Sequence, residues 1–380
     1  MQTNKPKFSL KDHLFNSEKI TKIASEIQAA YPQFDANAFV TTTLSKFPEL
    51  ELKARIEWIA DVLKIYLPEP FQQATTLLLN ALPAPCDPTK TDNDFGEFIY
   101  APYAAFVAKH GCHQDHLEFS LNALKAITTR FSAEDAIRYF INAFPEKSLE
   151  VIKNWAQDSH YHVRRLASEG TRPKLPWSQN ISLSPEQTIP ILNMLFDDKT
   201  RYVTRSVANH LNDISKINPV LALTTLDQWK KSKRQTDSEM AYIKKHALRT
   251  LIKKGHPEAI SSLGFSPNPD ITISPINLLQ DAVKIGQSVT FSFTVTAQKS
   301  ERLVIDYILH FQNKAGVLAN KKVHKLKQIE LAKNQSIQLS KTHPLRANMT
   351  TRSLYPGEHK IEIQINGKKI ESISFNLLSS

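Results

Sequence analysis

The stretch Trp155-Ala-Gln-Asp-Ser-His-Tyr-His-Val-Arg-Arg-Leu-Ala-Ser-Glu-Gly-Thr-Arg-Pro-Lys-Leu-Pro-Trp177 joins a predicted amphipathic helix to a proline-bounded loop. Asp158 or Ser159 can cap this helix, and Pro173 ends it. Its predicted buried stripe recurs every four residues and consists of Val163, Ala167 and Thr171. The two prolines of the loop favour an extended chain that presents Trp177.

Arg165 and Glu169 share the four-residue spacing but begin two residues later than the stripe. They therefore lie about 200° around the helix axis, and we predict that they face away from the buried side. By spacing alone, the pair is most simply a surface ion pair. A carboxylate, several arginines and a loop tryptophan in one short span nevertheless indicate more than packing.

The helical pattern of this stretch returns with a spacing of 40 residues, from Val163 to Val203 and then to Ile243. A period of about 40 residues in a helical segment is typical of HEAT-type repeats, whose helices stack in register. Stacking would align Arg165 with Arg205 and Lys245, and Glu169 with Asn209 and Arg249. We predict a curved α-solenoid with cationic rows, which would suit a long polyanion.

Helical periodicity extends to about residue 265, so we assign residues 1–265 to one helical domain. Two prolines within Gly264–Asp270 mark a linker. Beyond it, apolar and polar residues alternate in short runs, and Asn366-Gly367 predicts a hairpin turn. About seven strands favour an immunoglobulin-like sandwich over residues 271–380. The predicted fold class is mainly α, with a HEAT-like solenoid followed by an all-β sandwich.

The chain is basic, with 48 Lys and Arg against 37 Asp and Glu, a net charge of +11. After residue 269 there are 15 basic and 8 acidic residues, so the predicted β domain holds +7 of this charge. Its lysines cluster around one predicted hairpin at Lys314, Lys321, Lys322, Lys325 and Lys327. Such lysines either protect an exposed strand edge or form a nucleic-acid surface, and both interpretations stay open.

Several classes of protein are disfavoured by the same composition. The two cysteines, Cys86 and Cys112, provide neither a disulfide framework nor a zinc cluster and indicate a cytoplasmic protein. No apolar run reaches the ~18 residues of a transmembrane helix, and the N-terminus lacks the apolar core of a signal peptide. The histidines show no metal-ligand spacing, and no nucleotide-binding or hydrolase motif occurs. We expect a monomer without cofactor, metal or membrane partner.

Two longer motifs, His162–Trp177 and Arg205–Ile214, carry a resemblance to a known family, and three shorter motifs support it. The shorter ones are Lys245–Leu251, Phe131–Glu134 and Leu50–Arg55. Over about residues 10–265 the chain resembles the AlkC-type branch of the AlkD-like HEAT-repeat DNA glycosylases. Some AlkC-type proteins also carry a C-terminal immunoglobulin-like domain. The resemblance implies excision of 3-methyladenine-like cationic bases from damaged duplex DNA, without the full base flipping of most glycosylases.

The resemblance also implies which residues form the active site. By motif these are Glu169, Glu134, Asp213 and Trp177. A cationic base is already a good leaving group, so carboxylates need only stabilise the positive sugar and position a water. An aromatic face favours a cation by ~0.5–2 kcal/mol. Cationic side chains would hold the DNA phosphates, and the expected contacts are Arg164, Arg165, Arg172, Arg201, Arg205, Lys245, Arg249, Lys321 and Lys322.

Simpler roles for the acidic residues also remain open. Ser132 has capping-box spacing to Asp135, so Glu134 can be merely an acid of the first helical turn. Asp213 can pair with Lys216. The rival hypothesis is a non-catalytic helical-repeat scaffold that binds DNA or protein. Only the enzyme requires Glu169 and Trp177 at the concave surface, near the bound strand.

Overall fold

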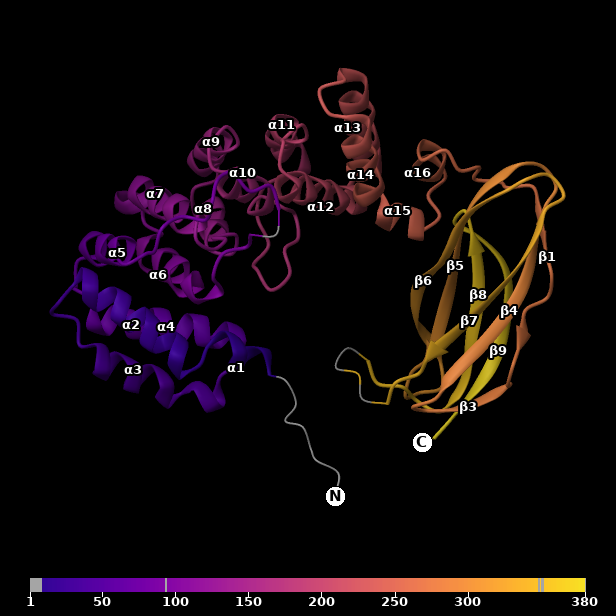
Figure 1. Ribbon diagram of the computed structural model, residues 1–380, viewed down its shortest axis with the longest axis horizontal. Helices are drawn as coiled ribbons and strands as arrows, with labels where there is room; N and C mark the ends of the chain where they lie inside the picture. The colour runs from indigo at the N-terminus through magenta and orange to yellow at the C-terminus, as the bar shows by residue number, and fades with distance from the viewer. Residues whose placement is uncertain (1–8, 93, 348, 350–351, 380) are drawn as a thin grey trace. The chain divides into compact units, whose positions relative to one another are not determined.

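A computed structural model describes residues 9–92, 94–347, 349 and 352–379 (Figure 1). The chain forms two compact units, Met1–Ala247 and Leu248–Ser380. The first unit is helical, and the second contains the strands and two short helices. The predicted order, a helical region followed by a β-sandwich, is confirmed.

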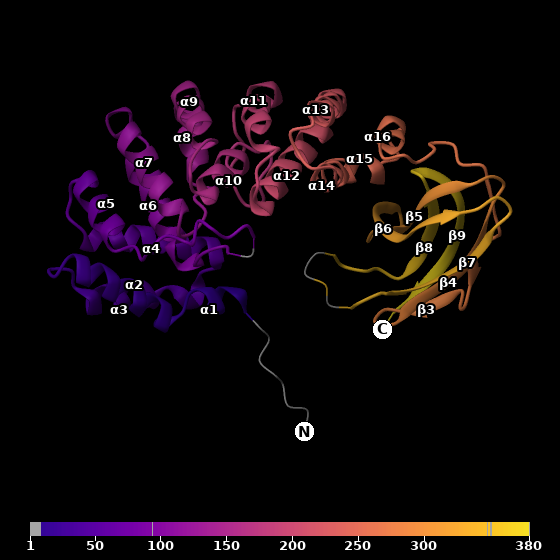
Figure 2. The same ribbon diagram turned by 45° about the horizontal axis from the view of Figure 1, so that its top comes forward.

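Helices of the first unit stack side by side in chain order (Figures 1 and 2). They are α1 (Leu10–Leu14), α2 (Ser17–Ala30), α3 (Ala36–Ser45), α4 (Leu52–Tyr66), α5 (Phe71–Asn80), α6 (Ala101–Gly111), α7 (Leu117–Thr128), α8 (Ile137–Ala143), α9 (Pro145–Trp155), α10 (Tyr161–Glu169), α11 (Pro185–Leu195), α12 (Arg201–Ile217), α13 (Pro219–Ser232) and α14 (Asp237–Ala247), with the 3₁₀ turns η1 (Phe47–Glu49), η2 (Phe98–Tyr100) and η3 (Gln114–His116). Helix α12 packs against both α10 and α14. The helices related by the 40-residue spacing are therefore direct neighbours.

Local signals predicted the cores of these helices better than their ends. The stripe of Val163, Ala167 and Thr171 is buried as predicted. Helix α10, however, begins at Tyr161 with His160 as its N-cap, and it ends at Glu169, before Pro173. The third repeat helix, predicted to be continuous, divides at Leu248 into α14 and α15 (Arg249–Lys253).

The capping box predicted at Ser132 is absent. Residues 134–136 form a turn, and α8 begins only at Ile137. The Ser132 hydroxyl donates to Oε2 of Glu134 at 2.8 Å and accepts from Nη1 of Arg165 at 2.7 Å. These partners engage the hydroxyl, and it caps no helix.

The second unit is a two-sheet sandwich whose apolar core lies between the sheets. Its strands are β1 (Ile271–Ile273), β2 (Asn277–Leu278), β3 (Ala282–Lys284), β4 (Ser288–Ala297), β5 (Glu301–Gln312), β6 (Leu318–Leu331), β7 (Ser336–Pro344), β8 (Gly357–Ile365) and β9 (Lys368–Leu378). One sheet has the order β1-β4-β2 with β7 also paired to β4, and the other has the order β3-β9-β8-β5-β6. Most of the lysine cluster lies on β6, an edge strand that pairs along β5.

Helices α15 and α16 (Pro257–Ser262) belong to the sandwich unit, although the sequence places them before the linker. Nε2 of Gln364 donates to the carbonyl of Lys253 at 3.2 Å. The predicted Asn366-Gly367 turn is present, with a φ of 77° at Gly367. A Cβ on Gly367 would lie 2.3 Å from the Cα of Gly255, so the turn also needs glycine for this close approach. The units consequently divide upstream of the predicted linker.

Within the described part of the chain, no helix combines the length and the apolar character needed to cross a membrane.

Candidate active site

A pocket of about 570 Å³ opens in the helical unit between α4, α6, the segment before α8 and the loop after α10. Much of its wall is apolar, since α6 contributes a row of alanines and α4 contributes Leu52 and Ile56. Of the predicted site residues, Glu134, Arg165 and Trp177 line this pocket. Glu169 and Asp213 do not line the pocket, but a series of ion pairs connects them to Glu134.

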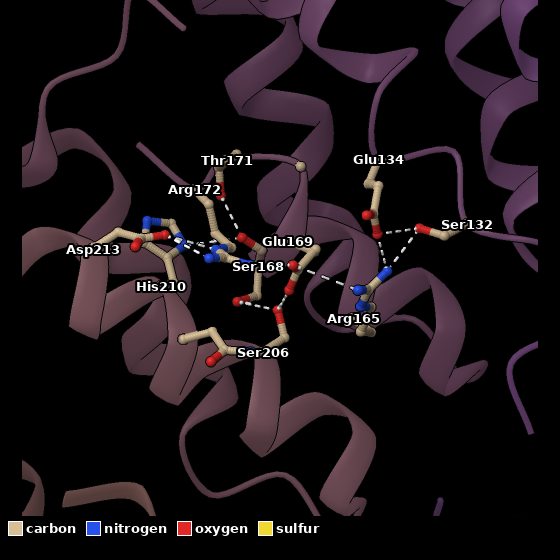
Figure 3. Close-up of polar contacts among 12 residues, drawn as sticks. Ser132, Glu134, Arg165, Ser168, Glu169, Thr171, Arg172, Ser206, His210 and Asp213 are labelled. Carbon is tan, nitrogen blue, oxygen red and sulfur yellow. Dashed lines mark hydrogen bonds and ion pairs between the residues drawn. The ribbon is translucent and has the colours of Figure 1, made fainter. Parts of the chain in front are cut away.

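Five of the predicted residues form one chain of alternating charges, and Figure 3 shows it around Glu169. We call it the charge chain; in order it comprises Glu134, Arg165, Glu169, Arg172 and Asp213. These residues come from the turn before α8, from α10, from the following loop and from α12. Stacking of the helices therefore connects groups as far apart in sequence as Glu134 and Asp213, about two repeats.

Glu169 occupies the centre of the charge chain and is only 4% exposed. Its Oε1 accepts a hydrogen bond from Arg172 and lies 3.5 Å from Nη2 of Arg165. Its Oε2 accepts a hydrogen bond of 2.6 Å from the hydroxyl of Ser206 on α12. Facing away from the stripe of Val163 does not leave Glu169 and Arg165 on an open surface, because α12 packs over them with Ser206 and Tyr202. The two charged residues are not a surface ion pair.

Glu169 is held in its ionised form despite its burial. Burial raises the pKa of Glu169, but Arg165, Arg172 and the hydrogen bond from Ser206 together hold this pKa below its usual value. Burial likewise lowers the pKa of Arg165, while Glu134 and Glu169 outweigh it and raise the pKa. The centre of the charge chain is therefore a set of fully charged groups shielded from water.

Asp213 terminates the charge chain on α12 and is 3% exposed. Oδ2 of Asp213 accepts a hydrogen bond of 2.8 Å from Nε of Arg172. Its Oδ1 accepts one of 2.7 Å from Nζ of Lys216, so the simpler pairing considered from the sequence also exists. Glu134 terminates the other end, with a partly exposed side chain at the pocket wall.

Trp177 lies at the rim of the pocket with its side chain 78% exposed. Its backbone adopts a φ of 66°, in the left-handed region that residues with a side chain rarely occupy. Its carbonyl accepts a hydrogen bond of 2.6 Å from Nζ of Lys53 on α4. The loop therefore presents an open aromatic ring at the pocket that Glu134 also lines.

Three of the arginines expected to contact DNA are instead paired within the protein, and one of them, Arg165, is a member of the predicted row with Arg205 and Lys245. Arg165 and Arg172 belong to the charge chain, and Arg164 pairs with Asp198 and with two backbone carbonyls. The remaining expected DNA contacts are more accessible. Arg201 pairs with Glu239 and Arg205 with Asp92, and both arginines are partly exposed. Arg249 of the second unit is also partly exposed. The exposed lysines are Lys245 and, on β6, Lys321 and Lys322.

Sequence reasoning missed the support that Tyr202 and the proline-rich loop of residues 83–97 provide. The Arg165 guanidinium lies 5.0 Å from the centre of the Tyr202 ring. The loop reaches the same helices, since Nε2 of His162 donates to the carbonyl of Asp94 at 2.9 Å. Burial lowers the pKa of His162 to about 4, so this ring is neutral at physiological pH. The only sequence signal near this contact is the pair His160 and His162, whose spacing excluded a metal site but indicated no partner.

Among the described residues, no group of three or more His, Cys, Asp or Glu side chains could hold a metal ion.

Comparison with known proteins adds three findings. Residues 272–379 match the family model described as "Uncharacterised protein YhaZ, C-terminal Ig-like domain". The Uncharacterized protein YhaZ of Bacillus subtilis (strain 168) is 32% identical over 368 residues, covering 96% of this chain and 98% of its own length. The solved structure of the Pseudomonas fluorescens alkylpurine DNA glycosylase AlkC, bound to DNA containing an abasic site analog, is 34% identical. It matches 98% of this chain and all of its own, with a TM-score of 0.86.

Proposed function

This chain belongs to the AlkC family of DNA glycosylases, and from that premise we propose that it removes cationic N3-alkylated purines such as 3-methyladenine from duplex DNA. It would hydrolyse the N-glycosidic bond without full base flipping, as the first step of base excision repair of alkylation damage. The observation that carries this proposal is the full-length similarity to an alkylpurine DNA glycosylase, in a chain whose pocket holds Glu134 and Trp177 together.

The proposed chemistry uses the charge of the lesion. When the bond between the sugar and a cationic base breaks, the base leaves as a neutral molecule and the sugar takes on the positive charge. The charge chain contains three carboxylates and two arginines, and its pocket end is the carboxylate of Glu134. A carboxylate there can stabilise the sugar cation and accept the proton of the attacking water. Glu169 supplies a second fixed negative charge behind Arg165.

Trp177 and the accessible cations would place the DNA. The exposed indole can lie against the cationic base or sugar. Arg201, Arg205, Lys245 and Arg249 are the proposed phosphate contacts of the helices.

The proposed function predicts selectivity for charged lesions. In single-turnover reactions on matched duplexes, we expect release of 3-methyladenine to exceed release of uracil by at least ~100-fold, because the proposed mechanism stabilises a positive sugar and supplies no proton to a neutral leaving base. Efficient release of uracil would contradict the mechanism. Tight duplex binding with no release of either base would instead support the rival scaffold hypothesis.

We further propose that the β6 lysines contact DNA, although their edge position also suits protection of the strand. Replacing both Lys321→Gln and Lys322→Gln should weaken duplex binding and reduce the slope of log K against log salt by about 2, at ~0.9 per phosphate contact. Lys231→Gln is the matched control, since Lys231 is also exposed but pairs with Asp227 on α13. A slope that the double substitution leaves unchanged would favour edge protection alone.

A further inference from the structure

Arg138 is a fully buried arginine of α8 that the proposed chemistry does not use. Among the described residues, no ion pair links it to a carboxylate, and its hydrogen bonds go to three backbone carbonyls. It donates to Gln179 at 2.6 Å, to Gly170 at 3.1 Å and to Arg172 at 2.8 Å. Burial lowers the pKa of Arg138 without removing its charge at neutral pH. The buried guanidinium thus donates its hydrogen bonds to the segment between Gly170 and Gln179.

That segment carries Trp177 and is irregular along most of its length. It lacks the repeated backbone hydrogen bonds of a helix or strand, so side-chain contacts must determine its path. Asn142 of α8 provides a second anchor, donating to the carbonyl of Asn180 at 2.8 Å and accepting from the amide of Ser182 at 3.0 Å. Both ends of the Trp177 turn are therefore tied to α8.

Lys53 of α4, which also lines the pocket, holds the turn from another element. Its ammonium donates to the carbonyl of Trp177 at 2.6 Å and lies 3.3 Å from Oδ2 of Asp135. Packing of the Trp177 ring contributes little to fixing its conformation, because the residue is mostly exposed. Its left-handed backbone is also unfavourable for a residue with a side chain. The conformation of Trp177 is therefore imposed by its neighbours.

We propose that Arg138 and Lys53 are positioning residues that hold Trp177 at the pocket rim before DNA arrives. Fixing an exposed aromatic ring in advance removes the entropy of ordering it from the binding and reaction steps. The positioning is a property of the free protein, whereas its effect on base release rests on the proposed function.

The experiment compares Lys53→Met and Arg138→Met with the unmodified chain and with Lys53→Arg. Lys64→Met is the matched control, because Lys64 also lies on α4 and donates to a backbone carbonyl, that of Glu69, away from the pocket lining. The motion of Trp177 is measured by time-resolved fluorescence anisotropy, with Trp177→Phe in each background supplying the signal of the other tryptophans. Single-turnover base release, duplex Kd and Tm are measured in parallel.

We expect Lys53→Met to increase the fast motion of Trp177 and to lower base release about 10-fold, with Kd changed less than about 3-fold. Arg138→Met should act in the same direction and also lower Tm, whereas Lys53→Arg and Lys64→Met should behave like the unmodified chain. Unchanged Trp177 motion in both methionine variants would overturn the proposal, as would increased motion with undiminished release. If the unmodified chain releases no base, the proposed function fails. The anisotropy of the methionine variants then still tests whether Arg138 and Lys53 restrict the motion of Trp177.

Discussion

Glu169→Gln should lower the single-turnover release of 3-methyladenine by about 100-fold or more, as expected for the loss of a charge that acts in the transition state. The substitution keeps the shape of the side chain and an oxygen that can accept a hydrogen bond from Ser206 or Arg172. It removes the negative charge that the charge chain places behind Arg165. Glu134 is then the remaining carboxylate partner of Arg165 in the charge chain. Because the Arg165 charge is no longer shared with Glu169, it neutralises more of the Glu134 charge that would stabilise a positive sugar.

The same substitution should leave duplex affinity nearly unchanged, because Glu169 is buried and offers no surface to the DNA. Release is measured with enzyme in excess over the lesion duplex, and Kd by titration of the same duplex. Glu26→Gln is a suitable control: Glu26 is a partly buried helical glutamate that accepts hydrogen bonds from Tyr100 and does not line the pocket. Release by this control should stay within about 2-fold of that of the unmodified chain. Full activity in Glu169→Gln would remove the proposed role of that carboxylate.

Arg172→Met should lower the free energy of unfolding by about 3 kcal/mol at pH 7.5, because removing one partner of a buried ion pair leaves charge uncompensated. Two nearly inaccessible carboxylates, Glu169 and Asp213, lose a shared partner. Glu169 retains Arg165, and Asp213 retains Lys216. The expected loss of stability is therefore at the lower end of the range for breaking a buried ion pair. The measurement is equilibrium unfolding in urea.

The pH dependence of this loss identifies its cause. Since the pKa of Glu169 is depressed in the folded chain, its stabilisation is present above the unfolded pKa and is lost as the pH falls through the folded value. Without Arg172 the pKa of Glu169 rises, so the variant protonates this carboxylate at a higher pH than the unmodified chain does. The difference in free energy of unfolding between the two proteins should therefore become smaller as the pH falls from 7.5 to 4.5. Lys231→Met, which breaks an exposed pair, should leave the free energy of unfolding almost unchanged. An equal loss from Arg172→Met at both pH values would indicate lost packing instead.

The sequence alone determined the features that depend on neighbours along the chain. The 40-residue spacing predicted that α10, α12 and α14 are equivalent helices, and the four-residue stripe predicted the buried side of α10. Alternation of apolar residues predicted the longer strands, and Asn366-Gly367 predicted their hairpin. The resemblance to the AlkC-type glycosylases rested on contiguous motifs, and the full-length structural match confirms it. Periodicity and turn chemistry are local, so they can be recognised without knowing what packs where.

Only the tertiary structure decided what surrounds the charged side chains. The sequence predicted that Glu169 faces away from the buried stripe, but a helix packed between neighbours has no open face at that position, and the carboxylate became the buried centre of the charge chain. The contact of Lys53 with Trp177 joins residues 124 positions apart, and no spacing rule could have indicated it. The charge that a buried group carries depends on partners brought from other helices, because desolvation and Coulomb interaction act through space and not along the chain.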